Sequence, residues 1–227
     1  MKTKALLTEL TVLVLLTATA SFTAPSSLGP TGILNVPTAE TVTPGNFEML
    51  LAYDRPKAAD VGIDVWPVAT AGYGFANGEI GVSYFNAQGY TAVKGANAKY
   101  VFAHETQKSP SIAAGVIYLS GNTAETDVYL AAGHSLTLGT GDKARATAGL
   151  LYQKPTHDSN LTGMLGIEFG APEETTLGFD YIFNDIAAGS MFGVTARHHV
   201  TPDLAWQVGL GNHDRFLVGL TMKFGGK

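Results

Sequence analysis

Apolar and polar residues alternate along most of the chain, most clearly between Asp203 and Phe224. Two alternating runs flank the turn signal Gly211-Asn212-His213-Asp214. Successive side chains on a strand point to opposite faces of a sheet. Each run therefore predicts a strand with one apolar face and one polar or small face, and together they predict a β-hairpin.

The same alternation recurs upstream and predicts about twelve strands in all. No helix is expected to cover the apolar faces, which must therefore pack on a second sheet or face lipid. Besides the two strands of the last hairpin, the expected strands are residues 46–54, 66–75, 79–86, 94–104, 111–120, 126–136, 144–152, 161–169, 175–184 and 190–200.

The lengths of these strands suit a membrane. A strand of about 10 residues, rising about 3.3 Å per residue and tilted by about 40°, spans roughly the 25 Å of a lipid-facing band. Closing an even number of strands satisfies every backbone hydrogen bond within lipid. We therefore predict an all-β fold, an antiparallel transmembrane β-barrel over residues 46–224. The alternative is a soluble exported β-sandwich or ligand-binding barrel, whose apolar face would fill a core.

Composition favours the membrane barrel. Charged residues make up 15% of the chain, below the roughly 25% usual in soluble domains. The absence of cysteine excludes disulfides and thiolate metal sites. The net charge is −5 and no basic run follows residue 4, so nucleic acid is not an expected partner.

Residues 1–20 have the features of a signal peptide. Lys2 and Lys4 precede an apolar run over residues 10–16, and Ala18-Thr19-Ala20 forms a small-residue cleavage site. The alternative, a membrane-anchoring helix, needs about 20 apolar residues. We expect export, cleavage near Ala20, and a place in the outer membrane with lipid as a partner.

The face opposite the apolar one carries charges and many glycines, and we expect it to line the lumen. The glycines would leave room for a narrow channel, or they would only relieve crowding. The expected lumen-facing charges are Glu48, Glu79, Lys99, Arg145, Glu168, Asp180, Arg197, Arg215 and Lys223.

Residues 21–45 contain four prolines and no sustained period. Proline cannot donate to a sheet ladder, so we expect an irregular arm at the periplasmic end or inside the lumen. Closure of the barrel pairs the first strand antiparallel with the last. Glu48 should then lie beside Lys223, and Asp54 toward Arg215.

The sequence contains no convincing catalytic, cofactor or metal site. His198 and His199 are neighbours on one expected strand, so they point to opposite faces and cannot grip one metal ion together. His134 and Ser135 fail as a catalytic pair for the same reason. We expect no enzyme and no cofactor. Two possibilities remain, a narrow porin-like pore for a small solute or polysaccharide and a closed structural barrel.

One stretch resembles a known family. Residues 29–48 combine a Gly-x-Thr-Gly element, a Pro-Thr-Ala element and a Pro-Gly turn that enters the first strand, and they resemble the start of YjbH-type outer-membrane barrels. The resemblance implies a role in the cell envelope, in exopolysaccharide production and export. The matching residues are Gly29, Thr31, Gly32, Pro37, Thr38, Ala39, Pro44 and Gly45.

The last expected strand also resembles the C-terminal signal that the barrel-assembly machinery reads. Gly219, Met222 and Phe224 stand at suitable spacing for it. The resemblance implies that this machinery is a partner during assembly.

Overall fold

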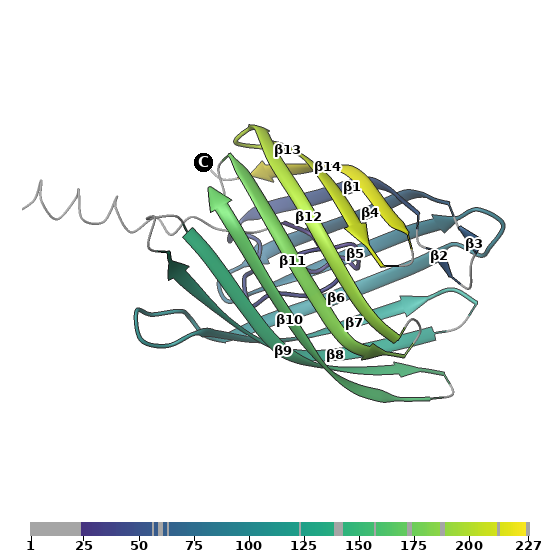
Figure 1. The fold of residues 1–227 in the computed structure, drawn as a ribbon, viewed down its shortest axis with the longest axis horizontal. Helices are drawn as coiled ribbons and strands as arrows, with labels where there is room; N and C mark the ends of the chain where they lie inside the picture. The colour runs from purple at the N-terminus through teal and green to yellow at the C-terminus, as the bar shows by residue number, and fades with distance from the viewer. Residues whose placement is uncertain are drawn as a thin grey trace, which may run out of the picture.

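Twelve antiparallel strands close into one barrel in the computed structural model (Figure 1). The structure describes residues 24–225 except 56, 59–60, 63, 123, 139–142, 157, 172–173, 187–188 and 213, so the expected signal peptide lies outside the described residues. The barrel strands are β1 (Asn46–Arg55), β4 (Val65–Phe75), β5 (Gly78–Ala87), β6 (Val93–Ala103), β7 (Ser111–Ser120), β8 (Ala124–Thr137), β9 (Lys143–Pro155), β10 (Asn160–Ala171), β11 (Thr175–Asp185), β12 (Gly189–Thr201), β13 (Leu204–Gly211) and β14 (Arg215–Gly225).

The predicted fold class is confirmed. Each strand pairs with its neighbours in the chain, and β1 pairs with both β4 and β14 to close the ring. Every strand expected from the alternation is present, with ends shifted by a few residues. One addition was not predicted, a small hairpin of β2 (Lys57–Ala58) and β3 (Val61–Gly62) between β1 and β4.

None of the described residues forms a helix long and apolar enough to cross a membrane.

The two faces of each strand divide as the alternation predicts. On β14, Val218 and Leu220 point outward and are 41% and 46% exposed, whereas Leu217, the neighbour of Val218 in the chain, is fully buried. On β8, Val128 and Leu130 are exposed and Tyr129 is buried. The outside of the barrel is therefore a continuous apolar surface, as a lipid-facing wall requires.

The inside of the barrel is less uniformly polar than the sequence suggested. In the strand 111–120, alternation brings the apolar Ile117 onto the face that is otherwise expected to be polar. The structure places Ile117 inside, in a buried apolar cluster with Tyr129, Leu151 and Met164. This part of the lumen is therefore a packed apolar core.

The seam between the first and last strands has the predicted register. Glu48 lies directly opposite Lys223. Asp54 accepts two hydrogen bonds from the guanidinium of Arg215, at 3.1 Å and 2.5 Å. A slip by one residue would turn these charges toward lipid, so the register is strongly specified.

A cysteine pair tests this seam. Directly opposite residues on antiparallel strands have Cα atoms about 4.5–5.5 Å apart, within the range that a disulfide spans. Glu48→Cys with Lys223→Cys should therefore crosslink on oxidation, which a mobility shift on gels would detect. Because the native chain has no cysteine, the background is clean. Asp54→Cys with Lys223→Cys is the matched control, and crosslinking of that pair instead would contradict the register.

Candidate functional site

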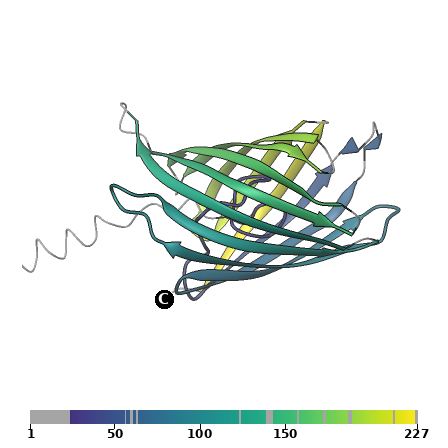
Figure 2. The same ribbon diagram turned by 90° about the horizontal axis from the view of Figure 1, so that it is seen from below.

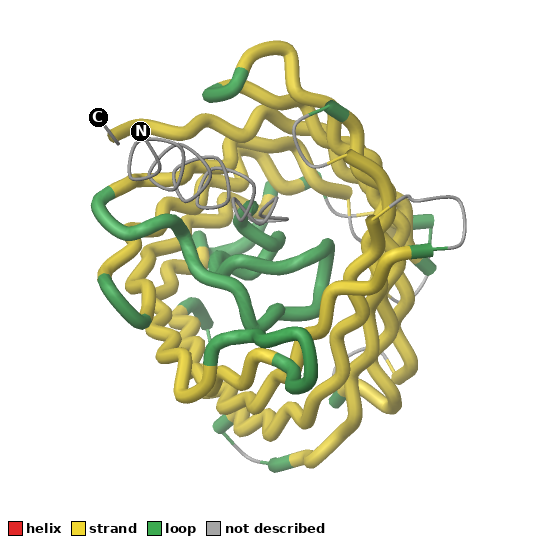
Figure 3. The backbone as a smooth tube through the Cα atoms, turned by 90° about the vertical axis from the view of Figure 1, so that its left-hand side faces the viewer, coloured by secondary structure: helices red, strands yellow, loops and turns green. Residues whose placement is uncertain are grey.

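Residues 24–45, which we call the N-terminal segment, run through the lumen. They are the purple trace enclosed by the strands in Figure 2 and part of the green tube inside the ring in Figure 3. Ile33, Leu34 and Val36 have no exposed surface. The segment turns back on itself through isolated bridges between Pro25 and Thr31 and between Gly32 and Pro37. The irregular arm expected from its prolines is thus an internal occupant of the barrel.

Local sequence explains the tight course of the segment. Gly29 has a φ of 115°, a conformation that side-chain-bearing residues rarely adopt. The N–H of Ile33 donates to the carbonyl of Val36 at 3.1 Å, closing a turn over residues 33–36. We call this turn the tip of the segment.

Asp180, on β11, holds the tip. Its Oδ2 accepts hydrogen bonds from the backbone N–H groups of Leu34, Asn35 and Val36, at 2.8, 2.6 and 3.2 Å. Its Oδ1 accepts from the side-chain amide of Asn35 at 2.9 Å. Successive N–H groups that converge on one anion form a nest, and hydrogen bonds to an ionised acceptor are stronger than neutral ones. The carboxylate and the three amides satisfy one another away from water.

Glu79, on β5, holds the middle of the segment in the same way. Its carboxylate accepts from the backbone N–H groups of Thr31 and Val42, at 2.7 and 2.8 Å, and from the hydroxyl of Thr31. Lys99, on β6, lies 3.2 Å from Glu79 and donates to the carbonyl oxygens of Thr31 and Glu40, at 2.9 and 2.6 Å. An ammonium has three donors, and each of them has a partner here.

Two arginines complete the charged contacts with the segment. Arg145, on β9, forms an ion pair with Glu40 and a second with Glu105, the latter at 2.7 Å. Arg215, which holds Asp54 at the seam, also donates to the side-chain oxygen of Asn35. The segment is therefore tied to strands on several sides of the ring.

Apolar contacts flank these polar ones. Val36 and Ala39 pack into the cluster formed by the inner residues of β6–β11. Leu34 packs on the other side against Leu50, Val68 and their neighbours. Burial of such side chains contributes roughly 1.5–3 kcal/mol each. The segment is consequently seated by both hydrophobic packing and hydrogen bonds.

The inner glycines form the seat of the tip. A Cβ at Gly178 would lie 2.7 Å from Cγ2 of Ile33, and a Cβ at Gly193 or Gly209 would lie 2.9 Å from a methyl carbon of Leu34. Real Cβ atoms do not approach so closely without a shift of the neighbour. The room that these glycines leave is occupied by the segment, so it does not make an open channel in this state.

Of the nine charges expected in the lumen, Glu48, Glu79, Lys99, Arg145, Glu168, Asp180 and Arg197 are buried there, while Arg215 and Lys223 are partly exposed. Five of the nine contact the segment, namely Glu79, Lys99, Arg145, Asp180 and Arg215. Glu168 and Arg197 are not hydrogen-bonded to the segment. Arg197 donates instead to Gln207 at 3.3 Å.

The residues that resemble the YjbH-type start lie at two levels. Pro44 and Gly45 are exposed at the rim where β1 begins. The others, Gly29, Thr31, Gly32, Pro37, Thr38 and Ala39, are buried in the lumen. The resemblance therefore falls on the part of the chain that fills the barrel.

The alternation predicts which charges line the wall, but it does not predict their partners in the segment. Asp180 and Glu79 bind backbone N–H groups of residues that stand at least 37 positions away, and no periodicity reports such contacts. Two sequence features together could have indicated these contacts. One is a proline-rich stretch without a strand pattern, and the other is a set of charges expected on the inner wall whose partners the sequence does not identify.

No group of three or more His, Cys, Asp or Glu among the described residues could hold a metal ion. His198 bonds to Thr175 across the strands at 2.8 Å, while His134 lies 3.1 Å from Glu105. His157 and His213 lie outside the described residues.

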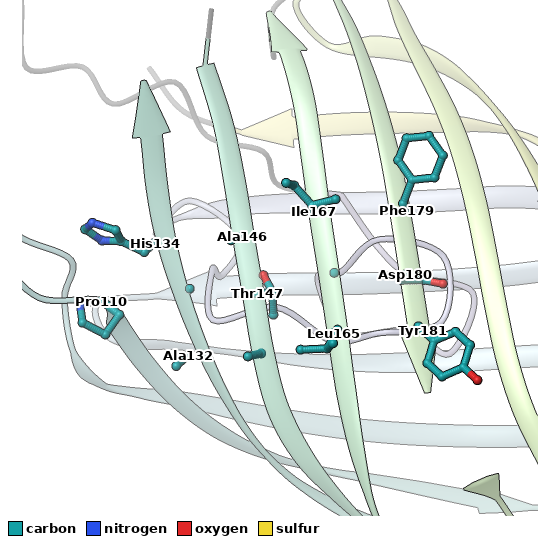
Figure 4. A pocket seen from close by; sticks show the side chains of 13 residues that line it. Pro110, Ala132, His134, Ala146, Thr147, Leu165, Ile167, Phe179, Asp180 and Tyr181 are labelled. Carbon is teal, nitrogen blue, oxygen red and sulfur yellow. The ribbon is translucent and has the colours of Figure 1, made fainter. Parts of the chain in front are cut away.

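A pocket of about 540 Å³ lies across β8–β11 (Figure 4). Ala132 pairs with Ala148, and His134 with Ala146, at one side of it. Larger side chains, Leu165, Ile167, Phe179 and Tyr181, line the strands beside these alanines. Leu165 and Phe179 are 47% and 45% exposed, so this pocket opens on the outer, apolar surface; Asp180, which holds the tip from the inner side, also lines it.

Comparison with known proteins supports the fold. No family model matches the chain, and no curated protein matches it. Among solved structures, the KdgM porin has a TM-score of 0.60 at 18% identity, over 78% of this chain and 99% of the porin. The KdgM porin in complex with disordered oligogalacturonate gives 0.59 at 16% identity, over 79% and 99%. The COG4313 outer membrane channel from Pseudomonas putida F1 gives 0.53 at 12% identity, over 84% and 100%. The chain therefore has the fold of outer-membrane β-barrels.

Asp180→Asn should loosen the tip. The amide keeps one acceptor but loses the charge, and its NH2 group must face either the three N–H groups or the side-chain amide of Asn35, so we expect a loss of about 3 kcal/mol in the free energy of unfolding. Denaturant titration would measure it. Asp127→Asn is the matched control, because Asp127 is a buried wall aspartate with no hydrogen bond to the segment and one oxygen without a partner. Equal losses in both variants would contradict the special role of Asp180.

Proposed function

We propose that this protein is an outer-membrane pore that its own N-terminal segment closes. The observation that carries the proposal is the seating of residues 24–42 in the lumen by charged residues of the wall. If the segment leaves, the wall exposes the carboxylates of Glu79 and Asp180 and the cations Lys99 and Arg145. A lumen lined by charges admits water and polar solutes.

The choice of polar contacts argues against a purely structural filling. A buried ion pair is often no more stabilising than apolar residues of similar volume, so a permanently closed barrel gains little from Lys99 and Glu79. Charged contacts can exchange partners with water when the segment moves. A barrel whose segment can leave needs charged wall residues in both states. They bind the segment when it is seated, and they face water when it is gone.

The connections of the barrel support a segment that enters from the end where β1 begins and β14 ends, which we call the terminal end. The longest connection at the opposite end joins β1 to β4 over residues 56–64. Outer-membrane barrels place short turns and chain ends on the periplasmic side. We therefore place the terminal end in the periplasm.

The solute class that we propose is saccharide. The resemblance of residues 29–48 to YjbH-type barrels favours a part in exopolysaccharide export. One porin of similar fold was solved with oligogalacturonate, which fits a carbohydrate solute.

A closed structural barrel is the second candidate. The apolar cluster around Val36, Ala39 and Tyr129 favours it, because it buries side chains of the segment together with those of the wall, as a domain core does. The two candidates differ in whether the segment ever leaves.

A reversible disulfide between the segment and the wall distinguishes the pore from the closed structural barrel. An ideal Cβ at Gly29 lies 3.7 Å from Cβ of Ser83, the separation that a disulfide needs. Gly29→Cys with Ser83→Cys should hold the segment in place when oxidised, although the positive φ of residue 29 adds some strain. In planar bilayers we expect no current from the oxidised protein and channel openings after reduction.

Asp180→Asn, which weakens the seat, should open more often than the native protein. The control is Ser83→Cys alone, whose conductance should not respond to reductant. Silence of the native, reduced and Asp180→Asn proteins alike would favour the closed structural barrel.

A further inference from the structure

The wall side chains that hold the segment bind mainly its backbone. Asp180 accepts from three backbone N–H groups, and Glu79 accepts from two. Lys99 donates to two backbone carbonyls, and Ser83 donates to the carbonyl of Leu28 at 3.1 Å. Recognition through main-chain atoms selects a peptide by its backbone conformation more than by the identity of its side chains.

These wall residues are charged or polar and deeply buried. Asp180, Glu79 and Lys99 are 4%, 1% and 2% exposed. A charge in such a place is costly unless hydrogen bonds compensate it. Without a peptide in the lumen, the two carboxylates would lose five backbone donors between them, three at Asp180 and two at Glu79. The wall is thus complementary to a peptide chain.

We propose that the lumen is a peptide-binding site in which the N-terminal segment is the resident ligand, so that a second peptide of the same shape can take its place. The inference rests on the proposed function, because exchange requires that the segment leave the lumen. The occupant is a short peptide with a tight turn, and such a peptide would open or close the pore from the terminal end.

The seat limits which peptides fit. The turn must present three consecutive N–H groups to Asp180, which excludes proline at the positions of Leu34, Asn35 and Val36. The residue at the place of Gly29 must adopt a positive φ. Gly178 and Gly193 lie against the tip and accommodate aliphatic side chains there. A linear peptide without this turn would leave the carboxylate of Asp180 unsatisfied.

The chain offers a place to convert the segment into a separate molecule. Thr43, Pro44 and Gly45 are exposed, whereas Val42 before them is buried. Exposed connections of this kind tolerate insertion and cleavage. A protease recognition sequence inserted between Thr43 and Pro44 of the full chain would allow the segment to be cut free after the barrel has folded.

The experiment follows the fragment after cleavage. We expect it to stay with the barrel during gel filtration and to exchange with a fluorescent synthetic peptide of residues 24–43. Asp180→Asn should weaken peptide binding at least about tenfold, the factor that about 1.4 kcal/mol gives, whereas Asp127→Asn should not. A synthetic peptide with Asn35→Pro, which lacks the middle N–H group, should bind at least as poorly as the native peptide binds to the Asp180→Asn barrel.

The outcomes separate this inference from the proposed pore. Loss of the fragment on cleavage with no rebinding of peptide would overturn the peptide site, and a current in the same sample would still support the pore. Retention without exchange would also overturn the inference. Exchange without any current, even in the emptied barrel, would support the peptide site and contradict the pore.

Discussion

The structure depends on how backbone amides are satisfied where water is absent. The strands meet this requirement by closing into a ring. The N-terminal segment bridges a barrel strand at its end, where Pro44 pairs with Gly74 of β4, and its turn over residues 33–36 points three N–H groups toward the wall. The carboxylate of Asp180 receives all three. Without that anion the segment would carry unsatisfied donors at a cost of about 1–3 kcal/mol each, and the lumen would be a poor place for it.

Other features follow from this contact. Inner glycines of β11, β12 and β13 let the backbone of the wall approach the tip closely. The apolar clusters on either side of Asp180 exclude water and so strengthen its hydrogen bonds. Lys99 and Arg145 balance the carboxylates of Glu79 and Glu40. The barrel supplies a rigid frame, and the segment supplies the groups that complete its charged lining.

Much of the barrel could be predicted from the sequence, because strand and face depend on local alternation. The alternation between Asp203 and Phe224 predicts opposite faces for the neighbours Leu217 and Val218, and charge and strand direction predict the seam from Glu48 to Lys223. In the strand 111–120 the inner face is harder to predict, because the inward-facing Ile117 is apolar. Ile117 packs in the apolar cluster that also contains Val36 and Ala39, and these two residues lie far from it in the sequence. The contacts of Asp180 and Glu79 with the segment could not be predicted from the sequence, because they too join residues that are far apart in the chain. They are long-range and join an irregular stretch to a regular one.

Hydrogen exchange of the segment's amides in lipid would test the central claim most directly. If Asp180 holds the tip in the lumen, the N–H groups of Leu34, Asn35 and Val36 should exchange slowly, as the strand amides do. In Asp180→Asn they should exchange much faster while the strand amides keep their protection. Rapid exchange of these three amides in the native protein would contradict the account, because it would mean that the segment spends its time outside the barrel.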